Sequence, residues 1–178
     1  MAREGAFLVP TLVTYFKIEE LGRALGFPAV SQRKVKDVLD AGLASLEIAK
    51  AAGVAIGFGT DLLGETHEHQ NQEFAIRARV LPAAEILRSA TLVNAALLRR
   101  EGELGVVAPG AFADLLVVDG DPLADVTLLA EPEKHLAAVM KGGEFAIVCP
   151  TYEDPAAAAK DIHERLMTRW LPNWSAEI

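Results

Sequence analysis

The sequence has a single cysteine, few basic residues and no long apolar run, and each shortage excludes a class of protein. Cys149 is the only cysteine and cannot form an internal disulfide, which favours a reducing compartment such as the cytoplasm. Lys and Arg total 17 against 25 Asp and Glu, and they form no long block, so a nucleic-acid partner is not expected. No stretch of about 18 consecutive apolar residues occurs, which argues against a membrane-spanning helix.

The remaining composition is that of a folded domain. Hydrophobic residues make up 51% and charged residues 24% of the 178 positions, which is enough apolar material to bury a core. We therefore expect the chain to fold around a core, and the alternation of strand and helix patterns along it predicts an α/β fold.

The first part of the chain predicts a strand, a helix and a second strand. Residues 7–15 are apolar without alternation, as in a strand buried on both faces. Ser31 is a candidate N-cap for a helix that Gly53 would end, and residues 54–61 form a second short apolar run. The apolar stripe of that helix comprises Val35, Val38, Leu39, Leu43, Leu46 and Ala49. Strand, helix, strand is one repeat of a parallel sheet.

The later part changes from helical to β patterning. A polar loop is predicted over residues 62–71, a helix over 72–80, another helix after Pro82, and a break near residues 89–91. Short β runs follow at 113–118 and 136–141, with Gly142-Gly143 as a hairpin turn, and an amphipathic helix closes the chain after Asp154. The predicted division is residues 1–103, 104–150 and 151–178.

Three polar side chains follow the second strand and are candidates for chemistry. Asp61 ends that strand, at the edge where parallel sheets carry function, although a loop aspartate can equally cap a helix. His67 and His69 form an H-x-H pair, which binds metal when both rings share one face of a strand. Their polar context leaves three interpretations open, namely a metal site, an exposed loop and a substrate contact.

A dinucleotide site is the other interpretation of the glycines beside Asp61. The run GFGTDLLG at residues 57–64 follows a strand, as a dinucleotide fingerprint would, but its glycine spacing does not fit G-x-G-x-x-G. No periodic helix follows it. A dinucleotide site is therefore not expected here.

Two stretches carry a resemblance to a known family. GVAIGFGTDLLGETHEHQNQEF (residues 53–74) and SATLVNAALLRREGELGVVAPGAFADLLVVDGDPLAD (residues 89–125) resemble the carboxyl-terminal part of the amidohydrolase superfamily. The branch is that of Xaa-Pro dipeptidases, related carboxypeptidases and imidazolonepropionase-like proteins. The likeness extends over roughly residues 1 to 147, and its most specific part is PGAFADLLVVDGDP.

This resemblance implies an enzyme that hydrolyses an amide or peptide C–N bond in a dipeptide or acylated amino acid. Asp61 matches the aspartate that ends the eighth barrel strand, where it binds zinc or another divalent metal and accepts a proton from the attacking water. The resemblance places His67 and His69 beside the substrate pocket.

The resemblance also implies the last part of a TIM (β/α)8 barrel, strands of a small β-sandwich and a carboxyl-terminal helix. Whole barrels typically need about 250 residues, and the family's histidine ligands and its lysine or glutamate ligand have no matching positions here. We therefore expect a fragment or truncated product whose missing ligands would come from another polypeptide. The alternative is a non-catalytic module that lacks the metal site and associates with itself through exposed strand edges.

Overall fold

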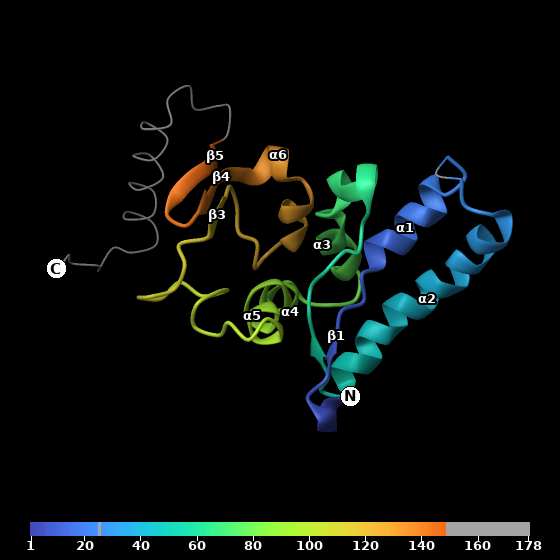
Figure 1. Ribbon diagram of the computed structural model, residues 1–178, viewed down its shortest axis with the longest axis horizontal. Coiled ribbons are helices and arrows are strands. Elements are labelled where there is room, and N and C mark those ends of the chain that lie inside the picture. Colours follow the sequence, from blue (N-terminus) through green and yellow to red (C-terminus); the bar gives the residue numbers. More distant parts are fainter. Residues whose placement is uncertain (25, 149–178) are drawn as a thin grey trace.

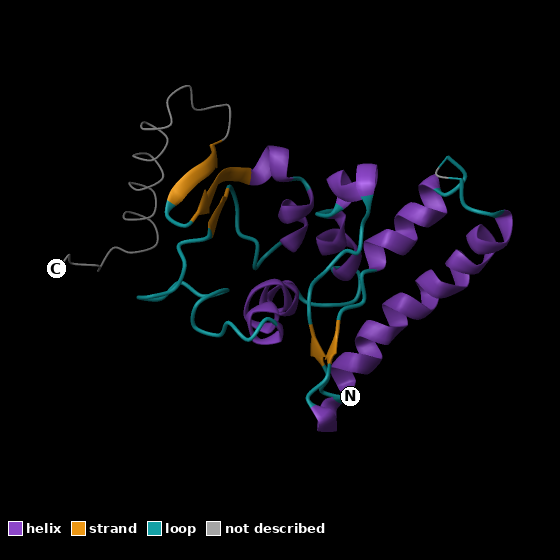
Figure 2. Ribbon diagram, viewed as in Figure 1, coloured by secondary structure: helices purple, strands orange, loops and turns teal. Residues whose placement is uncertain are grey.

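A computed structural model describes residues 1–24 and 26–148, which form a mixed helix and strand fold (Figure 1; Figure 2). The first half of the chain contains β1 (Phe7–Leu8), α1 (Leu12–Leu21), α2 (Ala29–Ala51), β2 (Ala55–Ile56), α3 (Gln72–Arg77), α4 (Ala83–Arg88) and α5 (Asn94–Leu97). The second half contains β3 (Leu115–Val118), α6 (Pro132–His135), β4 (Leu136–Lys141) and β5 (Glu144–Val148). Short turns of 3-10 or π helix are η1 (Ala2–Glu4), η2 (Gly64–His69), η3 (Ser89–Val93) and η4 (Val126–Ala130).

The first two strands pair in parallel, as the sequence predicts. Phe7 lies opposite Ala55 and Leu8 opposite Ile56. The connection between them is the antiparallel hairpin of α1 and α2 (Figure 1). The two strands therefore end at the same edge of the sheet, and the segments that follow them lie side by side.

Helices α1 and α2 pack closely and form one end of the core. Gly42 permits this approach, because a Cβ atom there would lie 2.8 Å from Cδ2 of Leu12. On α2, Val35, Leu39, Leu46 and Ala49 of the predicted stripe are buried, whereas Val38 is 40% exposed. The core continues through α3 and α4 to Val126 and Leu129 of η4, which connects the two halves of the chain.

The prediction of a strand over residues 7–15 is wrong beyond Leu8. Proline has no N–H for a ladder at position 10, Thr11 adopts a left-handed φ of 47°, and α1 begins at Leu12. The carboxylate of Glu73 accepts a hydrogen bond from the Val13 amide at 2.7 Å, which satisfies one of the free N–H groups at the start of the helix. A contact from a residue distant in the sequence thus stabilises a helix where the local pattern predicts a strand.

The N-cap prediction at Ser31 is also wrong, since α2 begins two residues earlier, at Ala29, after Pro28. A proline disfavours helical geometry in the residue before it, so the boundary falls at Pro28. The other end agrees with the prediction. Gly53 has a φ of 67°, and the amides of Gly53 and Val54 donate to the carbonyls of Lys50 and Ala49, which is a Schellman ending.

The segment after β2 is more ordered than a loop, since η2 occupies Gly64–His69. The predicted helix over residues 72–80 is present as α3 but ends at Arg77. The predicted break near residues 89–91 is the π turn η3, which connects α4 to α5 without leaving helical geometry. Ser89, the first residue of this turn, is buried, and its hydroxyl donates to the Ile86 carbonyl at 2.8 Å.

The second sheet is antiparallel, with β4 between β3 and β5. Gly142 and Gly143 have φ angles of 58° and 88° and form the β4–β5 turn, which confirms the hairpin prediction. The first predicted run starts as a strand at Leu115, two residues late, because Asp114 instead accepts a hydrogen bond from the Gly142 amide at 2.7 Å.

Two predictions fall outside the described residues, namely the closing amphipathic helix and any role for Cys149. Within the described ranges, no helix combines the length and the apolar character needed to cross a membrane.

Candidate functional site

Asp61 follows β2 without lying in it. The sequence predicts a strand over residues 54–61, but β2 ends at Ile56 and residues 57–60 form no strand, so the predicted strand is too long; Asp61 then turns with a φ of 51°. A positive φ in a residue other than glycine is uncommon, and aspartate is among the residues that tolerate it best. Its side chain is exposed. The carboxylate is therefore available to solvent at the end of a half-buried segment.

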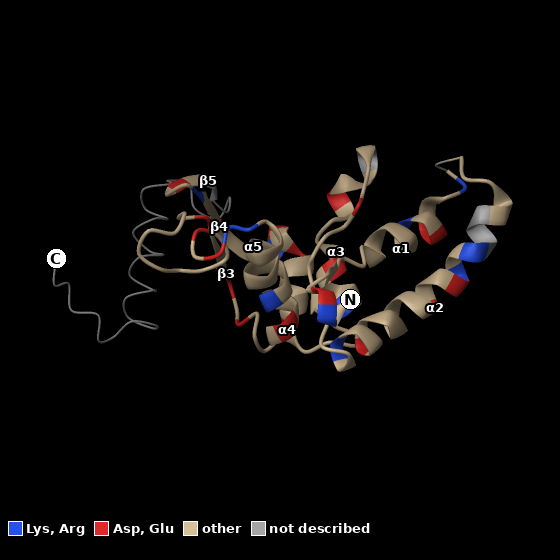
Figure 3. Ribbon diagram, turned by 60° about the horizontal axis from the view of Figure 1, so that its bottom comes forward, with Lys and Arg blue, Asp and Glu red and all other residues tan. Residues whose placement is uncertain are grey.

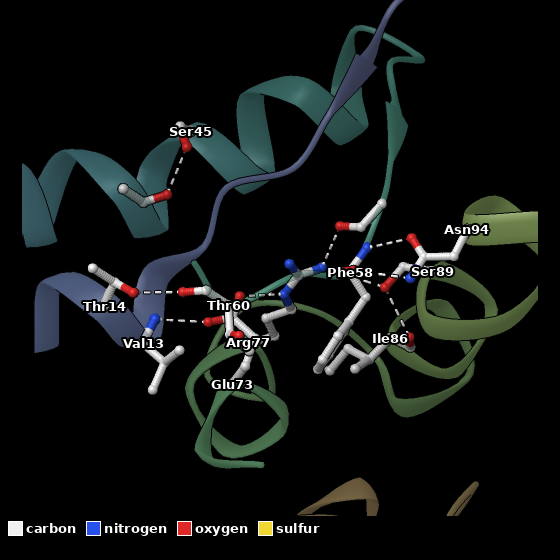
Figure 4. Close-up of polar contacts among 12 residues, drawn as sticks. Val13, Thr14, Ser45, Phe58, Thr60, Glu73, Arg77, Ile86, Ser89 and Asn94 are labelled. Atoms are coloured by element: carbon white, nitrogen blue, oxygen red, sulfur yellow. Dashed lines mark hydrogen bonds and ion pairs between the residues drawn. The ribbon is translucent and has the colours of Figure 1, made fainter. Parts of the chain in front are cut away.

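The neighbouring strand ends in the same unusual way. Thr11 follows β1 with a φ of 47°, and its helix contacts the second strand end because the Thr14 hydroxyl donates to the Thr60 carbonyl at 2.5 Å (Figure 4). Arg99 is the third non-glycine residue with a positive φ in the described chain, and it simply follows the end of α5. Strained backbone at paired strand ends is typical of functional sites.

A buried ion pair contacts the start of the segment that leads to Asp61. Glu73 and Arg77 have fully buried side chains on successive turns of α3, and Nε of Arg77 lies 2.6 Å from Oε1 of Glu73. The guanidinium lies 4.5 Å from the centroid of the Phe58 ring. Its Nη1 donates to the Gly57 carbonyl at 2.9 Å and to Ser89 Oγ at 3.3 Å (Figure 4).

Burial sets the electrostatics of this pair. It raises the pKa of Glu73 above the ordinary value, against the opposing attraction of Arg77 and the bond from Val13. Burial likewise lowers the pKa of Arg77, against the attraction of Glu73. Each partner offsets the desolvation of the other, so loss of one would leave an uncompensated charge in the core.

Asn94 contacts the same segment at Phe58, the residue after Gly57. Its Oδ1 accepts from the Phe58 amide and its Nδ2 donates to the Phe58 carbonyl, both at 2.9 Å. Neither Asn94 nor the Glu73–Arg77 pair is predicted from the sequence. The i, i+4 spacing of opposite charges between apolar neighbours in QEFAIR was the available signal for the pair.

His67 and His69 both lie in η2, after Asp61. His67 is exposed and His69 is half-buried, with Nε2 of His69 3.5 Å from the adjacent Glu68 carboxylate. Glu20 of α1 lies near enough to His69 for that ring to contribute a small lowering of the Glu20 pKa, after the larger effects of Lys17. The two histidines therefore lie in a turn near the end of α1, and no strand period aligns their rings.

An open cavity of about 430 Å³ lies between α1 and α3. Its lining comprises Phe16, Lys17, Glu19, Glu20, Gln72, Ala75, Ile76 and Arg79. Lys17 is 6% exposed and its Nζ lies 2.6 Å from Glu20. The lining does not include Asp61 or either histidine of η2, so this cavity is separate from the candidate catalytic group.

The comparison with family models identifies the chain. The model of the amidohydrolase family matches residues 1–146. The chain belongs to the amidohydrolase family. The match covers β1, β2, Asp61, the buried ion pair and most of the second sheet.

Solved structures agree with this assignment. An amidohydrolase crystal structure shares 48% identity with a TM-score of 0.79, covering 85% of this chain and 36% of that one. A prolidase complexed with N-methylphosphonate-L-proline shares 47% identity with a TM-score of 0.78 over 82% of this chain and 36% of that one. A Xaa-Pro dipeptidase with methionine in its active site shares 31% identity with a TM-score of 0.71 over 82% and 35%.

Curated relatives include deaminases. A 5-methylthioadenosine/S-adenosylhomocysteine deaminase of Desulfitobacterium hafniense is 33% identical over 120 residues, which is 62% of this chain and 27% of the relative. An adenine deaminase of Mesorhizobium japonicum is 32% identical over 103 residues, or 57% of this chain and 16% of the relative. The chain thus spans about a quarter of the first curated relative and about a third of the solved structures.

Proposed function

We propose that the chain forms the carboxyl-terminal part of an amidohydrolase that hydrolyses a C–N bond in a small substrate such as a dipeptide or acylated amino acid. The position of Asp61 carries this proposal. It follows the parallel strand β2 in a strained conformation, inside the segment that matches the family. The solved prolidase and Xaa-Pro dipeptidase favour a dipeptide over a purine, since they match more of this chain than the deaminases do.

Asp61 is the proposed acid and base. An exposed carboxylate at the strand end can take a proton from an attacking water and return it to the leaving nitrogen, because both transfers need only one mobile group within hydrogen-bond reach. The proposal also includes His67 and His69, which would contact the substrate from η2. Both lie on the turn that follows Asp61, and His69 is half-buried there.

Metal binding needs donors beyond those described. Amidohydrolases are generally metal-dependent, and zinc is the metal we propose for the family member. Across residues 1–24 and 26–148, no three His, Cys, Asp or Glu side chains gather closely enough to hold an ion. Asp61 would therefore supply one ligand of a set that these residues do not complete, and no catalytic step is assigned to the metal.

The architecture proposed for the whole enzyme follows the same family match. Residues 1–103 would close a TIM barrel, residues 104–150 would contribute strands to a β-sandwich, and residues 151–178 would form the tail. The parallel pair and the separate antiparallel sheet support this division. The single cysteine supports a reducing compartment, and we propose the cytoplasm.

The experiment compares Asp61→Asn with Asp40→Asn, an exposed aspartate on α2. The purified chain is loaded with zinc and assayed on Xaa-Pro dipeptides, N-acyl amino acids and adenine nucleosides, with bound metal counted by mass spectrometry. Because the described residues do not complete a metal site, the comparison needs a preparation that takes up zinc. In such a preparation we expect dipeptide hydrolysis to fall about 10² to 10⁴ fold in Asp61→Asn and to be unchanged in Asp40→Asn. If the wild-type chain neither takes up zinc nor hydrolyses any of these substrates, the proposed activity does not belong to this chain alone.

A second candidate is a non-catalytic module that associates with itself. The observation that favours it is the two-stranded sheet of β1 and β2, whose outer edges pair with no other strand in the described part of the chain. Unpaired edges are templates for further strands. Light scattering distinguishes the candidates, since oligomers without hydrolysis support the module, and a monomer with cooperative unfolding contradicts it.

A further inference from the structure

The segment from Gly57 to Asp61 lies beyond the two-stranded sheet, so its backbone polar groups need hydrogen-bond partners from elsewhere. β2 ends at Ile56, and the Gly57 amide makes the last bond to β1, donating to the Leu8 carbonyl at 2.9 Å. Beyond that point, residues 58–60 are half-buried and pair with no neighbouring strand among the described residues. Buried backbone N–H and C=O groups require partners, so side chains must supply them.

Asn94 acts as a substitute for that strand. Its amide bonds to both the N–H and the C=O of Phe58, at 2.9 Å each, which is the pattern that a residue of an adjacent strand would offer. Glycine at position 57 makes room for it, because a Cβ atom there would lie 3.1 Å from Asn94 Oδ1 and 3.1 Å from Val9. Asn94 directly follows the π turn η3, and its side chain points toward Phe58 (Figure 4).

Two further contacts fix the ends of the same segment. Arg77 donates to the Gly57 carbonyl on one side of Phe58, and Thr14 donates to the Thr60 carbonyl just before Asp61. Of these contacts, only the Asn94 pair holds both polar groups of one residue, and it therefore fixes the orientation of the peptide planes that lead to Asp61. Arg77 is fully buried, whereas Asn94 is half-buried beside the strand end.

We propose that Asn94 is a positioning residue for Asp61, holding the Phe58 backbone so that Asp61 keeps its left-handed conformation and presents its carboxylate at the strand end. This inference rests on the proposed function of Asp61. It adds a residue that lies 36 positions from Phe58 in sequence and touches neither substrate nor reacting atoms. Without the two hydrogen bonds between Asn94 and the Phe58 backbone, the segment is free to rotate and Asp61 can relax to an extended conformation.

The test uses NMR of the full chain labelled with ¹³C and ¹⁵N, without metal or substrate. Asn94→Ala is compared with Thr91→Val, which removes a hydroxyl that bonds only within its own helix, to the Leu87 carbonyl. In Asn94→Ala we expect the Phe58 amide to exchange at least about tenfold faster. The Asp61 Cα and Cβ shifts should move away from left-handed values, whereas Thr91→Val should change neither.

Asn94→Asp is the variant that keeps the shape of the side chain. It retains the acceptor for the Phe58 amide and removes the donor to the Phe58 carbonyl, so Phe58 should stay protected while the Asp61 shifts still move. The Asp61 shifts of Asn94→Asp test the proposal even if Asn94→Ala does not fold. Unchanged Asp61 shifts in either folded variant would overturn the proposal.

The measurement separates this inference from the proposed function. The NMR signals require no hydrolysis, so an inactive chain with displaced Asp61 shifts in the Asn94 variants would support positioning and contradict only the activity. In an active preparation, Asn94→Ala should lower kcat about tenfold or more with KM nearly unchanged, because positioning acts on the reacting group and not on substrate binding.

Discussion

Two regions of this chain use the same kind of interaction in opposite settings. In the N-terminal region, residues 1–98, Glu73 and Arg77 pair with fully buried side chains. In the C-terminal region, residues 113–148, Lys141 and Asp114 pair at 3.4 Å with side chains 80% and 37% exposed. Figure 3 shows acidic and basic residues in both regions.

The difference teaches where this fold is sensitive to substitution. A buried pair costs desolvation energy and must stay complete, whereas an exposed pair is screened by water and contributes little. The buried pair also contacts the segment that leads to Asp61, through the bond from Arg77 to the Gly57 carbonyl, and the exposed pair lies beside the β4–β5 hairpin. Loss of charge should therefore damage the candidate site far more than it damages the second sheet.

The largest effect is expected from Arg77→Met. The variant leaves the Glu73 carboxylate buried without its partner, and we expect the free energy of unfolding to fall by about 3–5 kcal/mol. Urea denaturation followed by circular dichroism measures it. The double variant Glu73→Leu/Arg77→Met removes both charges and should lose clearly less than the single variant. Equal losses in the two would show that the pair has no special role.

Leucine truncation compares the packing of the two regions. Leu46 of α2 is 0% exposed and Leu116 of β3 is 54% exposed. We expect Leu46→Ala to cost about 2–5 kcal/mol, because a buried cavity remains, and Leu116→Ala to cost less than about 1 kcal/mol. Thermal unfolding of both variants provides the measurement. A similar loss of stability in the two variants would mean that Leu116 contributes to packing as much as Leu46 does.

Sequence reasoning succeeds where a pattern is local. The stripe on α2, the glycine that ends it and the Gly142-Gly143 hairpin all depend on neighbours a few positions away, and all three are present. It fails at α1, because this helix begins where the Glu73 carboxylate reaches the Val13 amide from 60 positions away. No periodicity in residues 7–15 carries that information.

The candidate site shows the same division. Asp61 could be placed after the second strand, since a short apolar run and a polar stop predict that position, although the strand itself ends earlier, at Ile56. Asn94 and Arg77 could not be placed beside the segment that follows the strand, because their contacts with Phe58 and Gly57 span 36 and 20 positions. These contacts exist only once α3 and α5 pack against that segment.

A smaller effect is expected at the second hairpin. Gly143 has a φ of 88° and a Cβ atom there would meet only Ala113, at 3.9 Å, so space is not the constraint. Gly143→Ala should cost about 1–2 kcal/mol through backbone strain alone. Gly142→Asn is the matched control at a φ of 58°, and it should cost less, since asparagine tolerates this conformation. Thermal melting compares the two, and equal costs would contradict the strain argument.

The smallest effect concerns pH in the C-terminal region. The bond from the Gly142 amide, with Lys141 nearby, holds the pKa of Asp114 below its ordinary value. A lowered pKa in the folded state adds stability above the unfolded pKa of about 3.9, and this stability is lost as pH falls through the folded pKa. Asp114→Asn should therefore flatten the acid side of the stability curve, and Asp40→Asn should not. Urea titrations between neutral and acid pH decide it.

The parallel pairing of Phe7 with Ala55 has a consequence for the order of folding events. Closing so long a stretch of chain directly carries an entropic cost, but the helical hairpin of α1 and α2 shortens the effective span before the strands meet. Substitutions where the two helices touch, such as Gly42 against Leu12, should then slow refolding more than they accelerate unfolding. The left-handed turn at Asp61 would form late, after its two strands have found their register.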